Sequence, residues 1–316
     1  MNKPILFANG CSMCYGSGLF EDPETKLCFN NNERFASSWP GVLGRELGFR
    51  KVVNLGFPGS SNDRIVRTTI AWILENGFTE PQVTNSIFVI IGWSGPMRRE
   101  FYIHDDWRQL IPYHDYVDIP AALLNRIYRE VAWSEYESAI RFATQIISLQ
   151  AFFRSHKIPY LFFDAITSFM NTNIDSDNAL DIYLPHIDQN NYFNFKDKIG
   201  DMATQVGDSL KGAERGHPNS AGHFEWAHKL AKFIREKQLY FALNESIVNS
   251  EPIIFEGTGT VEIFDRKVGL SRKAPIAENF KRLKSFHDSQ VLQNTKQKGL
   301  LARVRQALHR DPFIYE

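Results

Sequence analysis

Short apolar runs alternate with segments of helical periodicity along most of the chain. The apolar runs at 5–9, 52–55, 87–91 and 159–165 predict strands. Between and after these runs, apolar residues recur every three or four positions, which predicts helices. Strands that alternate with helices are typical of a parallel sheet with helices on both faces. The pattern therefore predicts an α/β protein with a three-layer α/β/α arrangement and a mostly parallel sheet.

Four predicted helices carry one apolar face each. Gly48 marks the end of the first of them, and Ser134 and Glu137 have the spacing of a capping box at the start of the third. The apolar positions are Trp39, Val42, Leu43 and Leu47; Ile65, Val66, Ile70 and Ile73; Ala139, Ile140, Ala143, Ile147 and Phe153; and Trp226, Leu230, Phe233 and Ile234.

Two segments interrupt this alternation. Residues 101–120 are aromatic and acidic without obvious regularity, and they are a candidate lid or specificity insertion. Residues 167–201 are rich in Asn, Asp and Tyr and form a second long insertion. Loops at the carboxyl edge of a parallel sheet usually shape access to a site, and we expect that role for both.

The pattern changes near residue 238. Apolar segments at 252–256 and 261–264 flank Gly257-Thr258-Gly259-Thr260, which predicts a β-hairpin. The residues from 265 onward are basic, and apolar residues at helical spacing predict a last helix around 300–308. We expect a domain at 1–238 and a C-terminal extension at 239–316. The last helix is expected to dock on its own chain or on a second copy, with a membrane-surface role as the less favoured alternative.

Glycine and small polar residues follow the predicted strands in blocks. The first block contains Gly10-Cys11-Ser12, the second contains Gly59, and the third is Gly92-Trp93-Ser94-Gly95. A last block, Glu214-x-x-His217, precedes the fourth helix. A serine hydroxyl is a weak nucleophile until a neighbouring base takes its proton, and that base needs a third group to orient its ring. Ser12, His217 and Glu214 have the side chains for these three roles.

The four blocks in this order resemble the SGNH or GDSL hydrolase superfamily. The GCS-type serine block indicates a divergent branch, and the resemblance covers roughly residues 4–237. It implies a flavodoxin-like SGNH hydrolase fold, with Ser12 as nucleophile, His217 as base and Glu214 as the orienting acid. It also implies that Gly59 and the third block supply donors to an oxyanion.

Two positions depart from the superfamily pattern. Ser94 stands where the family has an asparagine whose amide donates to the oxyanion, and losing such a donor typically costs about 10²- to 10³-fold in rate. Asn62 is a candidate to compensate. Glu214 replaces an aspartate, which keeps the charge. Among the neighbouring residues, Trp93 is either a substrate platform or core, and Arg98 belongs either to an anion-recognition site or to a solvated salt-bridge patch.

Composition bears on the class of function and on the cellular compartment. The 36 basic and 36 acidic residues balance, which gives no overall attraction to nucleic acid or to a membrane. No apolar run is long enough to span a membrane, and the amino-terminal apolar stretch is too short for a signal peptide, so we expect a cytoplasmic protein. Cys11 and Cys14 form a C-x-x-C, but neither a thioredoxin-like context nor a second ligand pair accompanies it, which favours buried small residues over redox or zinc chemistry.

These observations predict a serine esterase without metal or organic cofactor. The expected substrate is an acyl or acetyl ester of a carbohydrate, cleaved through an acyl-enzyme. Two alternatives remain: a catalytically weak binding or structural protein with the same fold, and an acyltransferase that uses the same triad. Homo-oligomerisation through the C-terminal tail is a further expectation.

Overall fold

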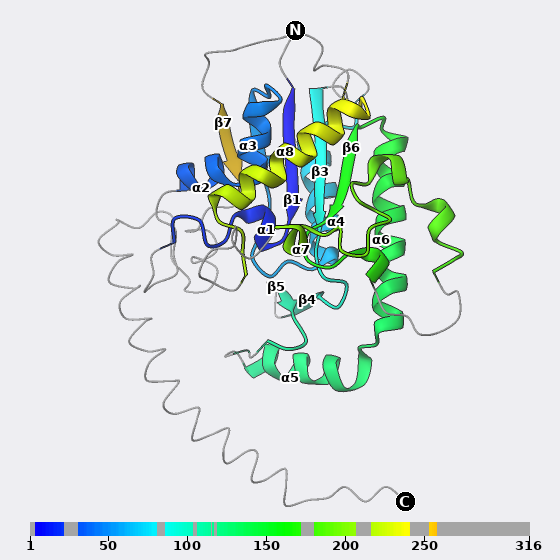
Figure 1. Ribbon diagram of the computed structural model, residues 1–316. Coiled ribbons are helices and arrows are strands. Elements are labelled where there is room, and N and C mark those ends of the chain that lie inside the picture. The colour runs from blue at the N-terminus through cyan, green and yellow to red at the C-terminus, as the bar shows by residue number, and fades with distance from the viewer. Residues whose placement is uncertain are drawn as a thin grey trace, which may run out of the picture. The chain divides into compact units, whose positions relative to one another are not determined.

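The computed structural model describes residues 4–21, 31–80, 86–103, 106–114, 116, 119–171, 180–206, 216–240 and 253–257. Its central sheet has five parallel strands in the order β6-β3-β1-β2-β7. The arrows in Figure 1 all point to one edge, next to which α1, α7 and the β4–β5 pair lie. The strands are β1 (Ile5–Gly10), β2 (Lys51–Asn54), β3 (Ile87–Trp93), β6 (Tyr160–Asp164) and β7 (Ile254–Gly257).

Helices precede, connect and follow these strands. They are α1 (Ser12–Tyr15), α2 (Asn31–Ser37), α3 (Trp39–Glu46), α4 (Asn62–Glu75), α5 (Ile119–Ile127), α6 (Glu135–Ser155), α7 (Met202–Gln205) and α8 (Ser220–Glu236). A π-helical turn, Tyr128–Ala132, follows α5. Three 3₁₀ turns follow β6: Phe169–Asn171, Leu184–His186 and Gln189–Asn191. At the start of α6, the Ser134 hydroxyl accepts from the Glu137 N–H at 3.0 Å, as half of the predicted capping box.

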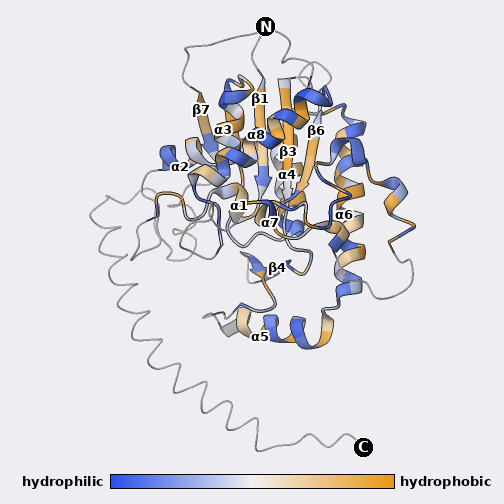
Figure 2. Ribbon diagram, viewed as in Figure 1, coloured by the Kyte–Doolittle hydropathy of each residue, from blue (hydrophilic) through white to orange (hydrophobic). Residues whose placement is uncertain are grey.

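Alternate strand residues pack into two separate cores. Leu6 and Ala8 of β1 face α3 and α8, whereas Ile5 and Phe7 face α4 and α6. In Figure 2, β3 and the amino-terminal part of β1 are orange, that is hydrophobic, because both faces of these central strands are covered. The three-layer α/β/α prediction is therefore confirmed, and the strands and helices predicted from apolar periodicity up to residue 237 all form.

The strand order of the sheet is flavodoxin-like for four strands and differs at the two edges. Strands β2, β1, β3 and β6 follow the order of a flavodoxin-like sheet, whose fifth strand would lie beyond β6. Here β7 pairs with β2 at the opposite edge, and the β6 edge is met by Tyr192, which forms a bridge with Phe162. The Phe193 N–H donates to the Phe162 carbonyl at 2.8 Å.

Both insertions are more ordered than the sequence pattern indicates. Residues 101–120 lack obvious regularity in the sequence, yet β4 (Arg99–Ile103) and β5 (Asp106–Leu110) form an antiparallel pair that leads into α5. In the second insertion, Ile187, Tyr192 and Phe195 are buried in the core on the α4 and α6 side. This segment therefore covers the sheet and does more than border a site.

Of the predicted hairpin, only the first apolar segment is among the described residues. Residues 254–257 form β7, which pairs in parallel with β2, while 261–264 and the predicted helix at 300–308 lie outside the described residues. Contacts divide the chain into the units Met1–Thr258 and Gly259–Glu316, and the domain boundary at 238 stays a prediction. Among the described helices, none has the length and apolarity that a membrane crossing requires.

Candidate active site

The predicted nucleophile lies directly after β1. Ser12 is the first residue of α1, a single turn that ends at Gly16 with a φ of 83°. Its carbonyl accepts from the N–H groups of Gly16 and Ser17 at 3.0 and 3.1 Å, which closes the turn. The left-handed conformation at Gly16 is one that a residue with a side chain rarely adopts, and it explains the glycine there. Ser12 is 8% exposed, so its side chain lies just beneath the surface at the carboxyl edge of the sheet.

The second block packs directly on this turn. The Phe57 N–H donates to the Gly10 carbonyl at 3.1 Å, and the Asn54 amide donates to the Cys14 carbonyl at 2.8 Å. Gly56 approaches so closely that a Cβ on it would lie 2.6 Å from the Tyr15 nitrogen. The sequence thus requires glycine at 56 to bring the loop after β2 against α1.

The third block is joined to the second by one side chain. The Asn62 carbonyl oxygen accepts from the Ser94 N–H at 2.8 Å, and the Asn62 amide donates to the Ser94 carbonyl at 3.2 Å. Both residues are fully buried. Asn62 therefore holds the backbone of Ser94, and this is the role that the structure gives it. The Ser94 hydroxyl has no hydrogen-bond partner among the described residues.

Two backbone donors at this edge remain unused. Among the described residues, the N–H groups of Ser12 and Gly59 donate to no other group. Gly59 has a φ of 79°, so the loop turns sharply at this point. Unpaired N–H groups beside a nucleophile are the donors that an oxyanion requires. The loops after β1, β2 and β3 thus bring Ser12, Gly59 and Ser94 to one edge, as the sequence predicts from the parallel strand order.

The predicted base lies on the loop before α8. His217 is half-buried, and a Cβ on Gly18 would lie 3.7 Å from the Cβ of His217, so the histidine borders the segment that follows α1. The Asn219 side chain caps α8 by accepting from the Gly222 N–H at 2.9 Å, which fixes the end of this loop. Glu214 lies outside the described residues, and its role as orienting acid stays a prediction.

A second histidine, His223, lies within the protein near His217. His223 is fully buried on α8, and its Nδ1 accepts from the Trp39 N–H at 3.2 Å. Burial, with a smaller contribution from the nearby His217, lowers the pKa of His223 to about 3. His223 is therefore neutral at physiological pH and acts in packing, as the sequence favours.

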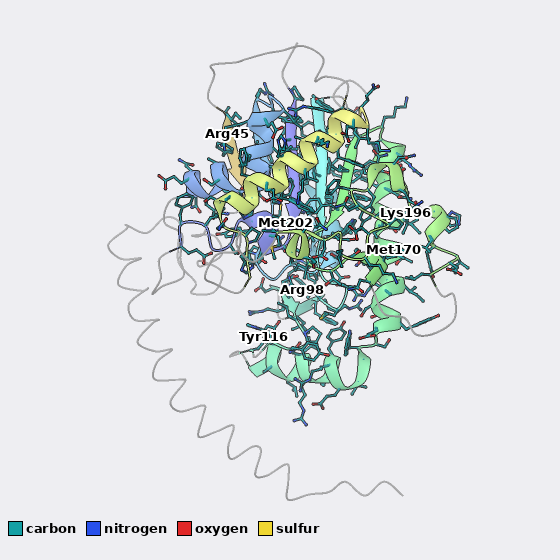
Figure 3. The ribbon with its side chains drawn as sticks, viewed as in Figure 1. Arg45, Arg98, Tyr116, Met170, Lys196 and Met202 are labelled. Carbon is teal, nitrogen blue, oxygen red and sulfur yellow. The ribbon has the colours of Figure 1, made fainter. Side chains whose placement is uncertain are left out.

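The predicted substrate contacts fall into different environments. Trp93 is fully buried, with its ring 5.2 Å from that of Phe162 and 5.6 Å from that of Phe142, so its core alternative fits the structure. Arg98 is partly exposed and donates to the Ser60 carbonyl at 3.4 Å. Figure 3 shows Arg98 beyond the carboxyl edge of the sheet, on the side where Tyr116 lies. Arg98 thus lies beside the second block. This position does not decide between anion recognition and a salt-bridge patch.

The C-x-x-C motif contributes two buried thiols. Cys11 and Cys14 are free and fully buried, and the Cys14 thiol donates to the side-chain Oδ1 atom of Asn54 at 3.3 Å. Burial raises the pKa of the Cys14 thiol well above its usual value, so Cys14 remains protonated. The favoured reading of the motif as buried small residues is consistent with this environment. Among the described residues, no group of three or more His, Cys, Asp or Glu side chains is placed to hold a metal ion.

Polar residues at the strand ends fix the loops of this edge, and the sequence interpretation missed them. The side chains of Asn9, Asn54 and Asp164 accept from the N–H groups of Gly10, Gly56 and Phe169 at 2.8 to 2.9 Å. Each of these residues lies at the carboxyl end of an apolar strand. A polar residue directly after an apolar run is the sequence signal that could have identified all three.

Asp164 gives this edge a dependence on pH. Burial raises the pKa of Asp164 to about 7, although hydrogen bonds from the Tyr192 hydroxyl and the Phe169 N–H oppose the shift. Because the folded-state pKa lies above the unfolded value of 3.8, protonation stabilises the fold. This contribution, about 4 kcal/mol by linkage, is complete below pH 4 and is lost as the pH rises to about 7.

Asp164→Asn is expected to change the pH dependence of stability. The variant is neutral at every pH, so its melting temperature relative to wild type should rise between pH 5 and pH 8. Thermal melts of both proteins at the two pH values measure this difference, and Asp181→Asn, at an exposed position, is the control. An equal difference at pH 5 and pH 8 would contradict the buried-carboxylate interpretation.

The comparisons with known proteins give one family and several distant structures. A search of curated proteins returns no match. Similar solved structures include the psychrotrophic esterase EstA from a Pseudoalteromonas species (9% identity, TM-score 0.39, 73% of this chain and 97% of that chain) and the acetylxylan esterase Axe2 from Geobacillus stearothermophilus (15%, 0.36, 79% and 100%). Another is a member of the lipolytic G-D-S-L family from Veillonella parvula (11%, 0.36, 73% and 96%).

The sequence family is shown by a match to a family model. Residues 18–244 match the profile of DUF6071, described as a family of unknown function. The match begins after Ser12 and includes the second and third blocks and His217. Because it extends over most of the chain, the protein belongs to the DUF6071 family.

Proposed function

We propose that this protein is a serine esterase of the SGNH type. The observation that carries the proposal is the convergence of three loops at one sheet edge, where Ser12 lies beside a loop whose Gly59 N–H is unpaired among the described residues. The proposed substrate is an ester, with an acyl or acetyl ester of a carbohydrate as the class that the superfamily resemblance implies.

Each proposed step uses a group of this chain. The Ser12 hydroxyl attacks the ester carbonyl while His217 takes its proton, and Glu214 orients the imidazole and stabilises its charged form. The developing oxyanion accepts hydrogen bonds from the N–H groups of Ser12 and Gly59, with the Ser94 hydroxyl as the third proposed donor. His217 returns its proton to the leaving alcohol, and water, activated by the same histidine, releases the acyl group. No step requires a metal or an organic cofactor.

Labelling with a fluorophosphonate probe tests the nucleophile. The expected result is one modified peptide with the probe on Ser12, and loss of labelling in His217→Ala because the hydroxyl then lacks its base. Ser17→Ala, in the segment that follows the same turn, is the matched control and should label as wild type does. Modification of a residue other than Ser12, or persistent labelling of Ser12→Ala, would refute the proposal.

A further inference from the structure

Ile111 lies beside the proposed oxyanion loop although it is 52 positions away in the sequence. Its Cδ1 atom is 3.7 Å from the position that a Cβ would take on Gly59, and apart from Gly59 and its two chain neighbours no other described atom lies within 4 Å of that position. Ile111 is partly exposed. Its N–H donates to the Tyr116 hydroxyl at 2.7 Å, and that hydroxyl donates to the Gln109 carbonyl at 2.9 Å. The backbone that carries this apolar side chain is thus held in place.

The β4–β5 pair before Ile111 is fixed to α4 by partly buried polar contacts. Arg67 of α4 donates two hydrogen bonds, of 2.7 and 2.8 Å, to the Glu100 carboxylate, and the Glu100 side chain is 1% exposed. The Glu100 N–H donates to Asp63, and the Gln109 side chain accepts from the Ser61 N–H at 2.8 Å. Paired charged groups with little exposure hold their geometry better than surface pairs do. The insertion is therefore anchored to the loop that contains Gly59.

The two faces of the sheet separate this insertion from the proposed base. His217 precedes α8, which packs with α3 in one core. The β4–β5 pair is tied to α4, whose apolar side belongs to the other core. In ester cleavage the leaving alcohol takes its proton from the histidine, so the alcohol lies on the histidine's side of the reacting carbon. An acyl group that extends away from the histidine would run toward the side of the sheet to which the β4–β5 pair is tied.

We infer that Ile111 bounds the acyl side of the Ser12 site and makes the enzyme selective for esters of short acyl groups. This inference rests on the proposed function. Ser12 is 8% exposed and Ser94 is fully buried, so we expect an acyl group on Ser12 to have little room toward the interior and to extend toward Ile111, which is partly exposed beside Gly59. Ile111 is a specificity-determining residue, because its side chain and not its backbone limits the space.

The test compares nitrophenyl acetate, butyrate and octanoate with wild type, Ile111→Ala and Ile111→Phe. The ratio of kcat/KM for butyrate to that for acetate should rise about 10-fold or more in Ile111→Ala, since one or two methylenes in a tight apolar site are worth at least that factor. Ile111→Phe should lower the same ratio. Leu123→Ala, at an exposed position on α5, is the matched control and should leave the ratio unchanged.

The outcomes separate the inference from the proposed function. Hydrolysis that depends on Ser12, with the same acyl ratio in wild type and both Ile111 variants, would overturn the inference and leave the esterase proposal standing. A change in selectivity for the alcohol portion, measured with acetates of different alcohols, without a change in acyl selectivity would also overturn it. Absence of any Ser12-dependent hydrolysis would refute both. Thermal melts of each variant establish that the protein is folded.

Discussion

Ser12→Ala is expected to lower kcat for short nitrophenyl esters by about 10³- to 10⁶-fold, the range for loss of a nucleophile in serine hydrolases. The melting temperature should stay within about 2 °C of wild type. The substitution keeps the Cβ and removes one hydroxyl at the first residue of α1, and the turn is closed by the Ser12 carbonyl and not by its side chain. Steady-state kinetics and a thermal melt on the same preparation measure both effects.

Three further variants make the result specific. Ser17→Ala should retain wild-type activity, because Ser17 lies in the segment after the same turn without a proposed role. His217→Ala should lose nearly as much activity as Ser12→Ala, whereas Glu214→Gln should lose less, because only ring orientation and stabilisation of the imidazolium are removed. Hydrolysis by Ser12→Ala at the wild-type rate would exclude Ser12 as the nucleophile, whereas absence of hydrolysis by wild type would favour the binding alternative.

The layered fold could be predicted from the sequence because strand and helix signals are local. Leu6 and Ala8 face one core and Ile5 and Phe7 the other, so β1 is apolar throughout, and that continuity is visible in the sequence itself. The carboxyl ends of parallel strands meet at one edge, which is why Ser12 and Ser94 could be predicted to converge. Both features follow from the local sequence, without knowledge of contacts between distant segments.

The rest of the site depends on contacts between distant segments. The β4–β5 pair has weak apolar alternation, and its anchor is the ion pair between Glu100 and Arg67, which are 33 positions apart. From the sequence alone, a tryptophan after a glycine could be a substrate platform or a core residue. The structure shows that Trp93 packs between Phe142 and Phe162. The raised pKa of Asp164 arises from burial by residues that the local sequence does not identify. The strand β7 likewise pairs with β2, which lies some two hundred positions earlier in the chain.

Gly56→Ala is expected to impair both stability and activity. A Cβ at this position would lie 2.6 Å from the Tyr15 nitrogen and 2.9 Å from both the Cys14 carbonyl carbon and the Asn54 Oδ1 atom. Because two of these neighbours are backbone atoms, the loop after β2 must move away from α1. Overpacking of this kind costs about 1–3 kcal/mol. A shift of about 1 Å between the nucleophile and its oxyanion donors can cost about 10²-fold in rate.

Gly95→Ala is the matched control for this substitution. Gly95 lies at the same edge of the sheet, and beyond its two chain neighbours no described atom lies within 4 Å of the position that a Cβ would take. Alanine there should leave the melting temperature unchanged or raise it slightly, because it restricts the unfolded chain. Thermal melts of both variants, with kcat measured for Gly56→Ala, provide the test. If Gly56→Ala has the same melting temperature as Gly95→Ala and keeps full activity, the close approach of the second block to α1 does not determine the geometry of the site. If it loses activity far beyond its loss of stability, the contact between this loop and the Ser12 turn sets the distance between nucleophile and oxyanion donors.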